Sequence, residues 1–124
     1  MEKKITTFED LQCWKSARDL RVDISQLIKT FPEHEKYDLS SQMRRASRSV
    51  TYNIAEGYGR FHFKENAQFV RTSRGSLYEL LDQLIISLEE NYINETQYNN
   101  IRFKILTTIK IVNGYINYLI SKEN

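Results

Sequence analysis

The 124-residue sequence is poor in residues that interrupt helices: it has one proline and four glycines. Both residues disfavour helix interiors, and a strand-rich chain would use more of them at its turns. Apolar residues make up 40% of the chain, and this length is sufficient for one domain to bury a substantial core. We therefore expect a single all-α domain over residues 1–124.

Cysteine and long apolar runs are also scarce. Cys13 is the only cysteine, so an internal disulfide is impossible and a reducing compartment is expected. No apolar run reaches 18 residues, and the lysines near the N-terminus are not followed by a stretch of signal-peptide length. These absences predict a cytoplasmic protein with no membrane partner.

Residues that carry catalysis or bind metals are few and scattered. His34 and His62 lie in separate connecting segments, without cysteines or carboxylates at zinc-ligand spacing. The Glu-x-x-His motif of di-metal bundles is missing. Cys13 lies on an apolar helix face, and no activating base is near it in the sequence. We expect a protein that is not an enzyme and uses no cofactor or metal.

Apolar residues recur at helical spacing in four segments. The first runs from about Glu9 to Lys29, and the second starts near Asp38, a plausible N-cap. The third spans about 64–91, and the fourth opens at a capping box over residues 94–97. Short connections between such helices predict an antiparallel up-down four-helix bundle. On the third helix, the face expected to meet the core comprises Ala67, Val70, Arg74, Leu77, Leu81, Leu84, Ile85 and Leu88.

The glycines mark a helix end and a crowded position. Gly57 and Gly59 are expected to take positive φ where the second helix ends. Because they follow a helix rather than a strand, they do not match a phosphate-binding loop. Gly75 lies inside the third helix, at a cost of about 1 kcal/mol relative to alanine. Close approach of a neighbouring helix, aided by Ser76, would explain that cost.

Positive charge is concentrated in the middle of the chain. Residues 44–74 hold seven Lys/Arg and two Glu, whereas the segments on either side carry more acids than bases. Arg44 and Arg48 lie opposite the apolar side of the second helix, so their guanidinium groups should reach solvent or a partner. Such clustering favours a polyanion or an acidic protein as partner. The residues expected to contact phosphates are Arg44, Arg45, Arg48, Arg60, Lys64 and Arg71.

A polar stripe lies about a quarter-turn from the apolar side of the second helix. Arg74 falls on the apolar side of the third helix, so it must reach water or an acid, and Glu56 is its expected partner. Glu56 and Glu79 could be an acid/base pair, but neutralisation by nearby arginines accounts for both. The expected structural polar network comprises Asn53, Glu56, Arg74, Ser76 and Glu79.

The fourth helix carries a second apolar strip away from its core-facing side, formed by Ile111, Tyr115 and Tyr118. Exposed apolar patches commonly mark interfaces, which favours self-association through this strip. Tyrosines can also stack on nucleic-acid bases, which is the alternative.

Motifs in a characteristic order extend over nearly the whole chain. The most specific is Asn-Ile-Ala-Glu-Gly-x-Gly-Arg at 53–60. Phe-Glu-Asp-Leu at 8–11, Phe-Pro at 31–32 and Arg-Arg-Ala at 44–46 precede it, and Gly-Ser-Leu at 75–77 follows. Together they resemble the four-helix-bundle family named for 23S ribosomal RNA intervening-sequence proteins. Ser73 departs from the alanine expected before Arg74.

The resemblance implies an antiparallel four-helix bundle that assembles into a homopentameric ring. A relative is the accessory protein of diversity-generating retroelements, which implies binding of nucleic acid and of a reverse transcriptase through basic surface. The leading hypothesis is thus a homo-oligomer that binds RNA or DNA mainly through phosphates. The alternative is a scaffold whose basic surface docks an acidic protein such as a reverse transcriptase, without binding nucleic acid.

Overall fold

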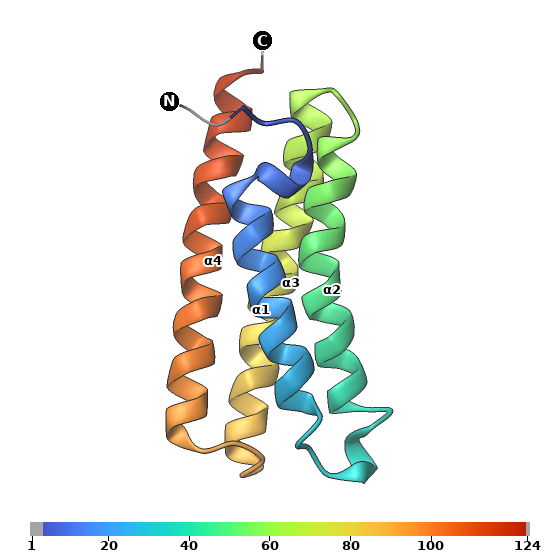
Figure 1. Ribbon diagram of the computed structural model, residues 1–124, viewed down its shortest axis with the longest axis vertical. Helices are drawn as coiled ribbons and strands as arrows, with labels where there is room; N and C mark the ends of the chain where they lie inside the picture. The colour runs from blue at the N-terminus through green and yellow to red at the C-terminus, as the bar shows by residue number, and fades with distance from the viewer. Residues whose placement is uncertain (1–3, 124) are drawn as a thin grey trace.

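A computed structural model describes residues 4–123 and consists of four long helices with no strand in this range. Successive helices run in opposite directions along one axis (Figure 1). This confirms the expected all-α, up-down four-helix bundle. In chain order the elements are the 3-10 turn η1 (Phe8–Asp10), α1 (Gln12–Ile28), the 3-10 turn η2 (Glu33–Glu35), α2 (Leu39–Tyr58), α3 (Phe63–Glu89) and α4 (Glu95–Ser121).

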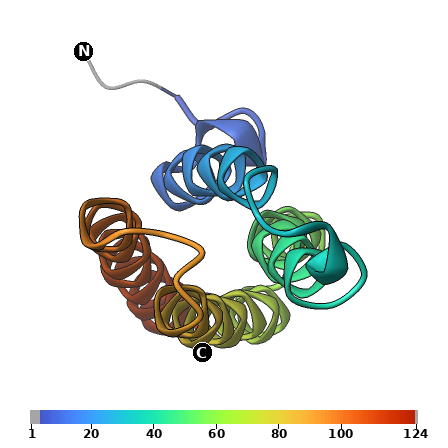
Figure 2. The same ribbon diagram turned by 90° about the horizontal axis from the view of Figure 1, so that it is seen from below.

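The helices follow one another around the bundle in chain order, so α1 lies next to α2 and α4 (Figure 2). Hydrogen bonds fix the antiparallel register of α2 and α3. Ser76 Oγ donates to Ser49 Oγ over 2.8 Å, and further along Ser87 Oγ contacts Met43 Sδ at 3.5 Å. The partner's number falls as the α3 number rises, as antiparallel helices require.

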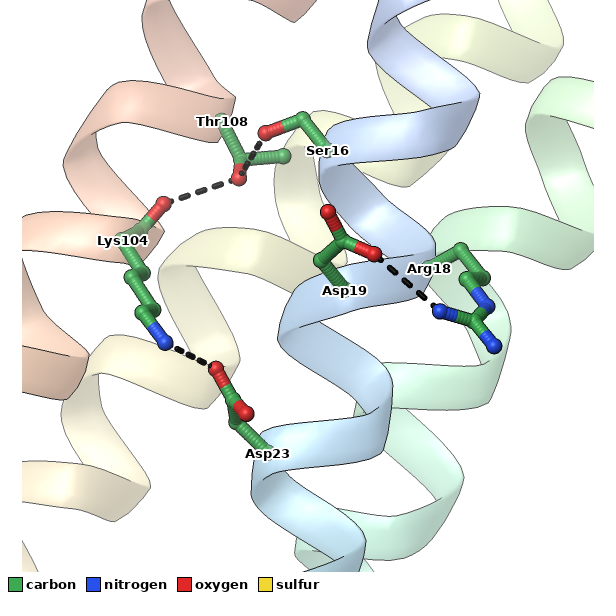
Figure 3. A network of polar contacts seen from close by, with 6 residues as sticks. All are labelled: Ser16, Arg18, Asp19, Asp23, Lys104 and Thr108. Atoms are coloured by element: carbon green, nitrogen blue, oxygen red, sulfur yellow. Dashed lines mark hydrogen bonds and ion pairs between the residues drawn. The ribbon is translucent and has the colours of Figure 1, made fainter.

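The seam between α1 and α4 is polar (Figure 3). The hydroxyls of Ser16 and Thr108 lie 2.7 Å apart, and Thr108 also donates to the carbonyl of Lys104. About two turns of α1 further on, the Lys104 ammonium donates to the Asp23 carboxylate. These contacts join the first helix to the last and close the bundle.

All four helices contribute to the core, and the apolar sides of α1, α2 and α4 are buried as their spacing predicts. Large side chains such as Ile24, Met43, Ile54 and Ile105 are wholly enclosed. Burying a side chain of this size contributes roughly 1.5–3 kcal/mol, so the buried apolar side chains supply most of the driving force for folding.

The expected core face of α3 is partly wrong. Ile85 is 37% exposed, and Arg74, Leu81 and Leu88 are only half-buried. The buried face is rotated toward α2, and it includes the small residues Ser73 and Ser87 together with Leu80.

The two serines explain this rotation. Ser73 Oγ donates to the Val50 carbonyl of α2 over 2.8 Å, and Ser87 Oγ donates to the carbonyl of Gln83 over 2.9 Å. Their hydroxyls are therefore satisfied inside the core, where an unpaired hydroxyl would be costly. Because serine is small, α2 and α3 can pack closely along this face.

The helix starts differ in detail from those expected. The α-helical part of α1 begins at Gln12 rather than Glu9, because Leu11 is extended and η1 precedes it. Asp38 occupies the N-cap of α2, but its side chain accepts no capping hydrogen bond; the Leu39 amide donates instead to Glu35 Oε1. The capping box at the start of α4 is confirmed.

The expectations for the glycines are partly wrong: α2 ends at Tyr58 with Gly59 as its C-cap, as expected, but the positive φ values and the close approach lie elsewhere. No glycine in the described residues has positive φ; Phe61 and Asn91 take that conformation, at 62° and 63°. The chain leaves α2 in right-handed geometry through Gly59 and turns only at Phe61. Close helix approach occurs at Gly57, where an added Cβ would lie 2.6 Å from Asn66 Oδ1, whereas one at Gly75 would meet nothing within 4 Å.

Candidate nucleic-acid interface

One side of the bundle, between α1 and α2, brings arginines from both helices together. Arg21 Nη1 of α1 donates to Thr51 Oγ1 of α2 over 2.9 Å, which shows that Thr51 faces α1. Arg48 and Arg44 precede Thr51 by three and seven residues, so they lie on the same side of α2. We call this surface, formed by Arg21, Arg44 and Arg48, the α1/α2 basic face.

Arginines on this face carry uncompensated charge. Within residues 4–123, no carboxylate lies within ion-pair distance of Arg21, Arg44 or Arg48. By contrast, the neighbouring Arg18 pairs with Asp19 on α1 at 3.2 Å (Figure 3). The α1/α2 basic face therefore offers three guanidinium groups for an external anion.

Lys64 and Arg71 lie on a different side of the molecule. Arg74 Nη1 donates to Asn113 Oδ1 of α4 over 2.9 Å, which identifies the edge of α3 that faces α4. Arg71 precedes Arg74 by three residues, and Lys64 precedes Arg71 by seven, so both project toward this edge. Both are exposed and, in the described part of the chain, without an ion-pair partner.

The two other predicted phosphate contacts have acidic neighbours. Arg60 lies 3.9 Å from both Glu56 and Glu65, and its guanidinium stacks on the Phe69 ring at 4.9 Å. Arg45 is exposed but lines a cavity in the α2/α3 groove together with Glu79. The six residues therefore do not form one surface: the sequence identified the basic charge, and the fold divides it.

A cavity of about 400 Å³ opens at the end of the α1/α2 basic face nearest η1. Arg21 and Arg48 line it beside the aromatic residues Trp14 and Tyr52. Tyr52 is 72% exposed, and the Trp14 ring contacts Phe8 edge to face with centroids 5.3 Å apart. The residues that line the cavity are Phe8, Trp14, Arg21, Arg48, Thr51, Tyr52 and Ala55, and none of these is acidic.

Sequence reasoning missed Arg21 and Trp14 as members of this site. Both lie in an N-terminal segment that has more acids than bases, whereas the excess of positive charge lies in residues 44–74. A usable signal was present, because Trp14 and Arg21 are seven residues apart and therefore share one side of α1. Only the pairing of α1 with α2 shows that this side meets Arg48.

The residues expected to form a polar network have separate partners. Asn53 Nδ2 donates to Ser49 Oγ, which also accepts from Ser76 Oγ, so Asn53 and Ser76 are joined through a serine not included in the prediction. The expected contact between Arg74 and Glu56 is wrong. Arg74 binds Asn113, and Glu56 pairs with Arg60 instead.

The strip expected to form an oligomer interface is only partly exposed. Ile111 and Tyr115 are half-buried against the core of the bundle, and Tyr118 is 51% exposed. Asn66 Nδ2 donates to the Tyr115 hydroxyl over 3.2 Å, and the ring of Tyr115 stacks on that of Tyr118. The tyrosines line a mainly apolar cavity of about 530 Å³, together with Ile5 and Leu119.

Burial determines the protonation state of the Cys13 thiol. Cys13 is 2% exposed, and desolvation raises the pKa of its thiol to about 12. At neutral pH the group is a neutral core side chain rather than a thiolate. Over residues 4–123, no cluster of three His, Cys, Asp or Glu side chains could hold a metal ion, and no helix is both long and apolar enough to span a bilayer.

Comparison with known proteins gives a consistent picture. Residues 9–114 match the model of the family described as 23S rRNA-intervening sequence protein. No curated protein matches the chain. A crystal structure from Bacteroides thetaiotaomicron, described as a protein of unknown function from the S23 ribosomal protein family, superposes with a TM-score of 0.78 at 20% identity. The match covers 85% of this chain and 95% of that one, which shows that the two share a fold. Because the family match extends over most of the four-helix bundle, the chain belongs to the 23S rRNA-intervening sequence protein family.

Proposed function

We propose that this protein is a non-enzymatic, homo-oligomeric nucleic-acid-binding protein that contacts phosphates mainly through the α1/α2 basic face. The observation that carries the proposal is the presence of three arginines from two helices on one side, with no carboxylate in ion-pair distance among residues 4–123. Guanidinium groups without an internal ion pair bind phosphate readily. Their N–H donors match the phosphate oxygens, and no ion pair to a carboxylate of the protein has to be broken first.

The other predicted contacts have secondary roles in this proposal. Lys64 and Arg71 add positive potential from the α4-facing edge of α3, and Arg45 and Arg60 are partly compensated by nearby glutamates. Such charges attract a polyanion without fixing its position. An oligomer would repeat the α1/α2 basic face and allow several weak contacts to act together.

A salt titration tests the proposal. Affinity for a fluorescent oligonucleotide should fall as salt rises, and log K should decline by about 0.7 per single-strand phosphate neutralised for each unit of log salt. The double variant Arg44→Gln/Arg48→Gln should flatten that slope by about 1.4, because two contacts are lost. The control Lys64→Gln/Arg71→Gln removes the same charge from the other side and should change the slope less.

Three results would count against the proposal. A salt-independent affinity, or no binding of RNA or DNA, would remove nucleic acid as the ligand. Equal effects of the two double variants would remove the assignment to the α1/α2 basic face. Recovery of one acidic protein after nuclease treatment, without nucleic-acid binding, would instead favour a scaffold for a protein such as a reverse transcriptase.

The homo-oligomer, which we propose to be a pentamer, has support from exposed apolar residues on α4. Phe103 is 70% exposed and Tyr118 is 51% exposed, and burial of such groups favours association. Sedimentation should give five times the subunit mass of 14.8 kDa. A single species of subunit mass would overturn the oligomer and leave the binding proposal to the salt titration.

A further inference from the structure

The cavity between η1, α1 and α2 has a composition that phosphate contacts alone do not require. It combines Arg21 and Arg48 with the side chains of Trp14 and Tyr52. We infer that this cavity is a binding site for a single unstacked nucleotide, whose base contacts the aromatic side chains and whose phosphate meets the arginines. The inference rests on the proposed function, and it specifies single-stranded nucleic acid as the form that the protein binds preferentially.

Arg21 is held in place for this role. Its Nη1 donates to Thr51 Oγ1 over 2.9 Å, and Thr51 Oγ1 donates to the carbonyl of Arg48 over 3.1 Å. One of the five N–H donors of the Arg21 guanidinium is thus used for orientation, and the others make no hydrogen bond within residues 4–123. A phosphate bound there would meet a pre-oriented donor and would cost less entropy to fix.

The aromatic side chains of the cavity are also held in place on the Trp14 side. The Asp10 carboxylate accepts hydrogen bonds from the amides of Thr6 and Thr7 over 3.0 and 3.3 Å, which fixes the η1 turn. Phe8 of that turn packs edge to face against Trp14. On the other side, Tyr52 is 72% exposed and makes no ring contact in the described residues, so its face is available for stacking.

Size and charge distinguish this cavity from its neighbours. Its volume of about 400 Å³ lies within the range of small-ligand pockets, roughly 300–1,000 Å³. The cavity in the α2/α3 groove contains Glu79 beside Arg45, so its charge is balanced. The larger cavity beside Tyr115 is mainly apolar and lacks arginine and lysine. The combination of aromatic side chains with two uncompensated arginines fits a nucleotide better than it fits a neutral apolar ligand.

A duplex keeps its bases stacked, so only a single strand or a frayed end can place a base in the cavity. Counterion release alone favours the duplex, because its charge density is higher. The inference therefore predicts the opposite order to simple electrostatics, with single strands binding more tightly than duplexes of the same length.

Trp14 is the only tryptophan in the chain, so its fluorescence reports on this cavity directly. We would titrate the full-length protein with a 15-nucleotide oligothymidylate, an abasic strand of the same length and a 15-base-pair duplex. The expected result is quenching of Trp14 by oligothymidylate, with affinity roughly tenfold to a hundredfold above that of the abasic strand, as base stacking on an aromatic side chain provides. Tyr52→Ala should remove most of this difference, whereas Tyr37→Ala, which alters an 84% exposed tyrosine outside the cavity, should not.

The outcomes separate the two proposals. If oligothymidylate and the abasic strand bind equally, with unchanged Trp14 fluorescence, the nucleotide site is wrong while phosphate binding remains. If no strand binds, the proposed function is wrong, and titration with adenosine monophosphate then tests the cavity alone. Quenching of Trp14 that Tyr52→Ala abolishes supports the nucleotide site. An absence of quenching overturns the nucleotide site. Quenching by a polyglutamate peptide but by no nucleotide would assign the cavity to acidic proteins and overturn the inference.

Discussion

Arg21 of α1 and Thr51 of α2 share a hydrogen bond of 2.9 Å that joins the two helices at the edge of the aromatic cavity. Thr51 is 4% exposed, and its hydroxyl also donates to the Arg48 carbonyl. This one side chain therefore couples the stability of the α1/α2 pair to the position of a phosphate-binding group.

Replacing Thr51 with valine tests that coupling. Thr51→Val keeps the shape of the side chain but removes the acceptor for Arg21, so we expect a loss of about 0.5–1.5 kcal/mol in the free energy of unfolding. Oligonucleotide affinity should fall several-fold because Arg21 is no longer oriented. Urea denaturation and fluorescence anisotropy measure the two effects. Thr72→Val is the control, because its exposed hydroxyl bonds only within α3; an equal loss of affinity there would contradict the role of Thr51.

Two glycines should respond in opposite ways to alanine. At Gly57 a Cβ would lie 2.9 Å from Phe69 Cβ and 3.0 Å from the Asn66 carbonyl, so Gly57→Ala should destabilise the protein by about 1–3 kcal/mol. At Gly75 nothing lies within 4 Å, and Gly75→Ala should stabilise it by about 0.5–1 kcal/mol through the lower entropy of the unfolded chain. Chemical denaturation followed by circular dichroism gives both values. Effects of the same sign would show that the α2/α3 approach at Gly57 is looser than described.

The hydrogen bond between Tyr92 and Glu35 should give stability a defined pH window. Tyr92 Oη donates to Glu35 Oε2 over 2.7 Å, and His34 Nε2 lies 3.2 Å from the same hydroxyl. This bond is the main cause that lowers the pKa of Glu35 below 4.5 and that raises the pKa of Tyr92 from 10.0 to about 12.

The sign of each effect follows from which protonation state the fold favours. The lowered Glu35 pKa adds stability above pH 4.5 that is lost as pH falls through the folded-state pKa, and the raised Tyr92 pKa adds stability below pH 10 that is lost as pH rises toward about 12. The difference in the free energy of unfolding between wild type and Tyr92→Phe should be largest between pH 4.5 and pH 10. Denaturation of both proteins across the pH range measures this difference. Tyr37→Phe is the control, because the Tyr37 hydroxyl makes no hydrogen bond within the described residues. A pH-independent difference for Tyr92→Phe would refute the linkage.

Cys13 should be unreactive in the native state. Its thiol is buried, and the pKa of about 12 leaves almost no thiolate at pH 8. We expect labelling by a thiol reagent only at the rate at which the bundle opens, with full labelling in urea. A label that reacts in seconds with folded protein would contradict the placement of Cys13 in the core.

Tyr118 tests the proposed assembly through α4. Because it is 51% exposed, Tyr118→Glu should leave the helical circular-dichroism signal unchanged. A charge in an apolar interface is costly, so the variant should shift sedimentation toward smaller species. Tyr78→Glu alters a similarly exposed tyrosine on α3 and provides the matched control. An unchanged oligomer in Tyr118→Glu would exclude this tyrosine from the interface.

The sequence by itself determined the four helices, the buried sides of α1, α2 and α4 and the family. Helical spacing of apolar residues is a local property, and Ile24, Met43 and Ile105 are enclosed as that spacing requires. The capping box at Asn94 and Gln97 is equally local, since both partners lie within one turn.

Tertiary structure decided which polar and charged residues meet. The core side of α3 follows Ser73 and Ser87 because α2 supplies the Val50 carbonyl for the first and the Met43 sulfur for the second, and neither partner is visible in the α3 sequence. In the same way, Arg21 joins Arg48 only because α1 packs antiparallel against α2, while Arg71 points elsewhere. Pairing across helices depends on rotation and register, which arise from packing of the whole bundle rather than from any single segment.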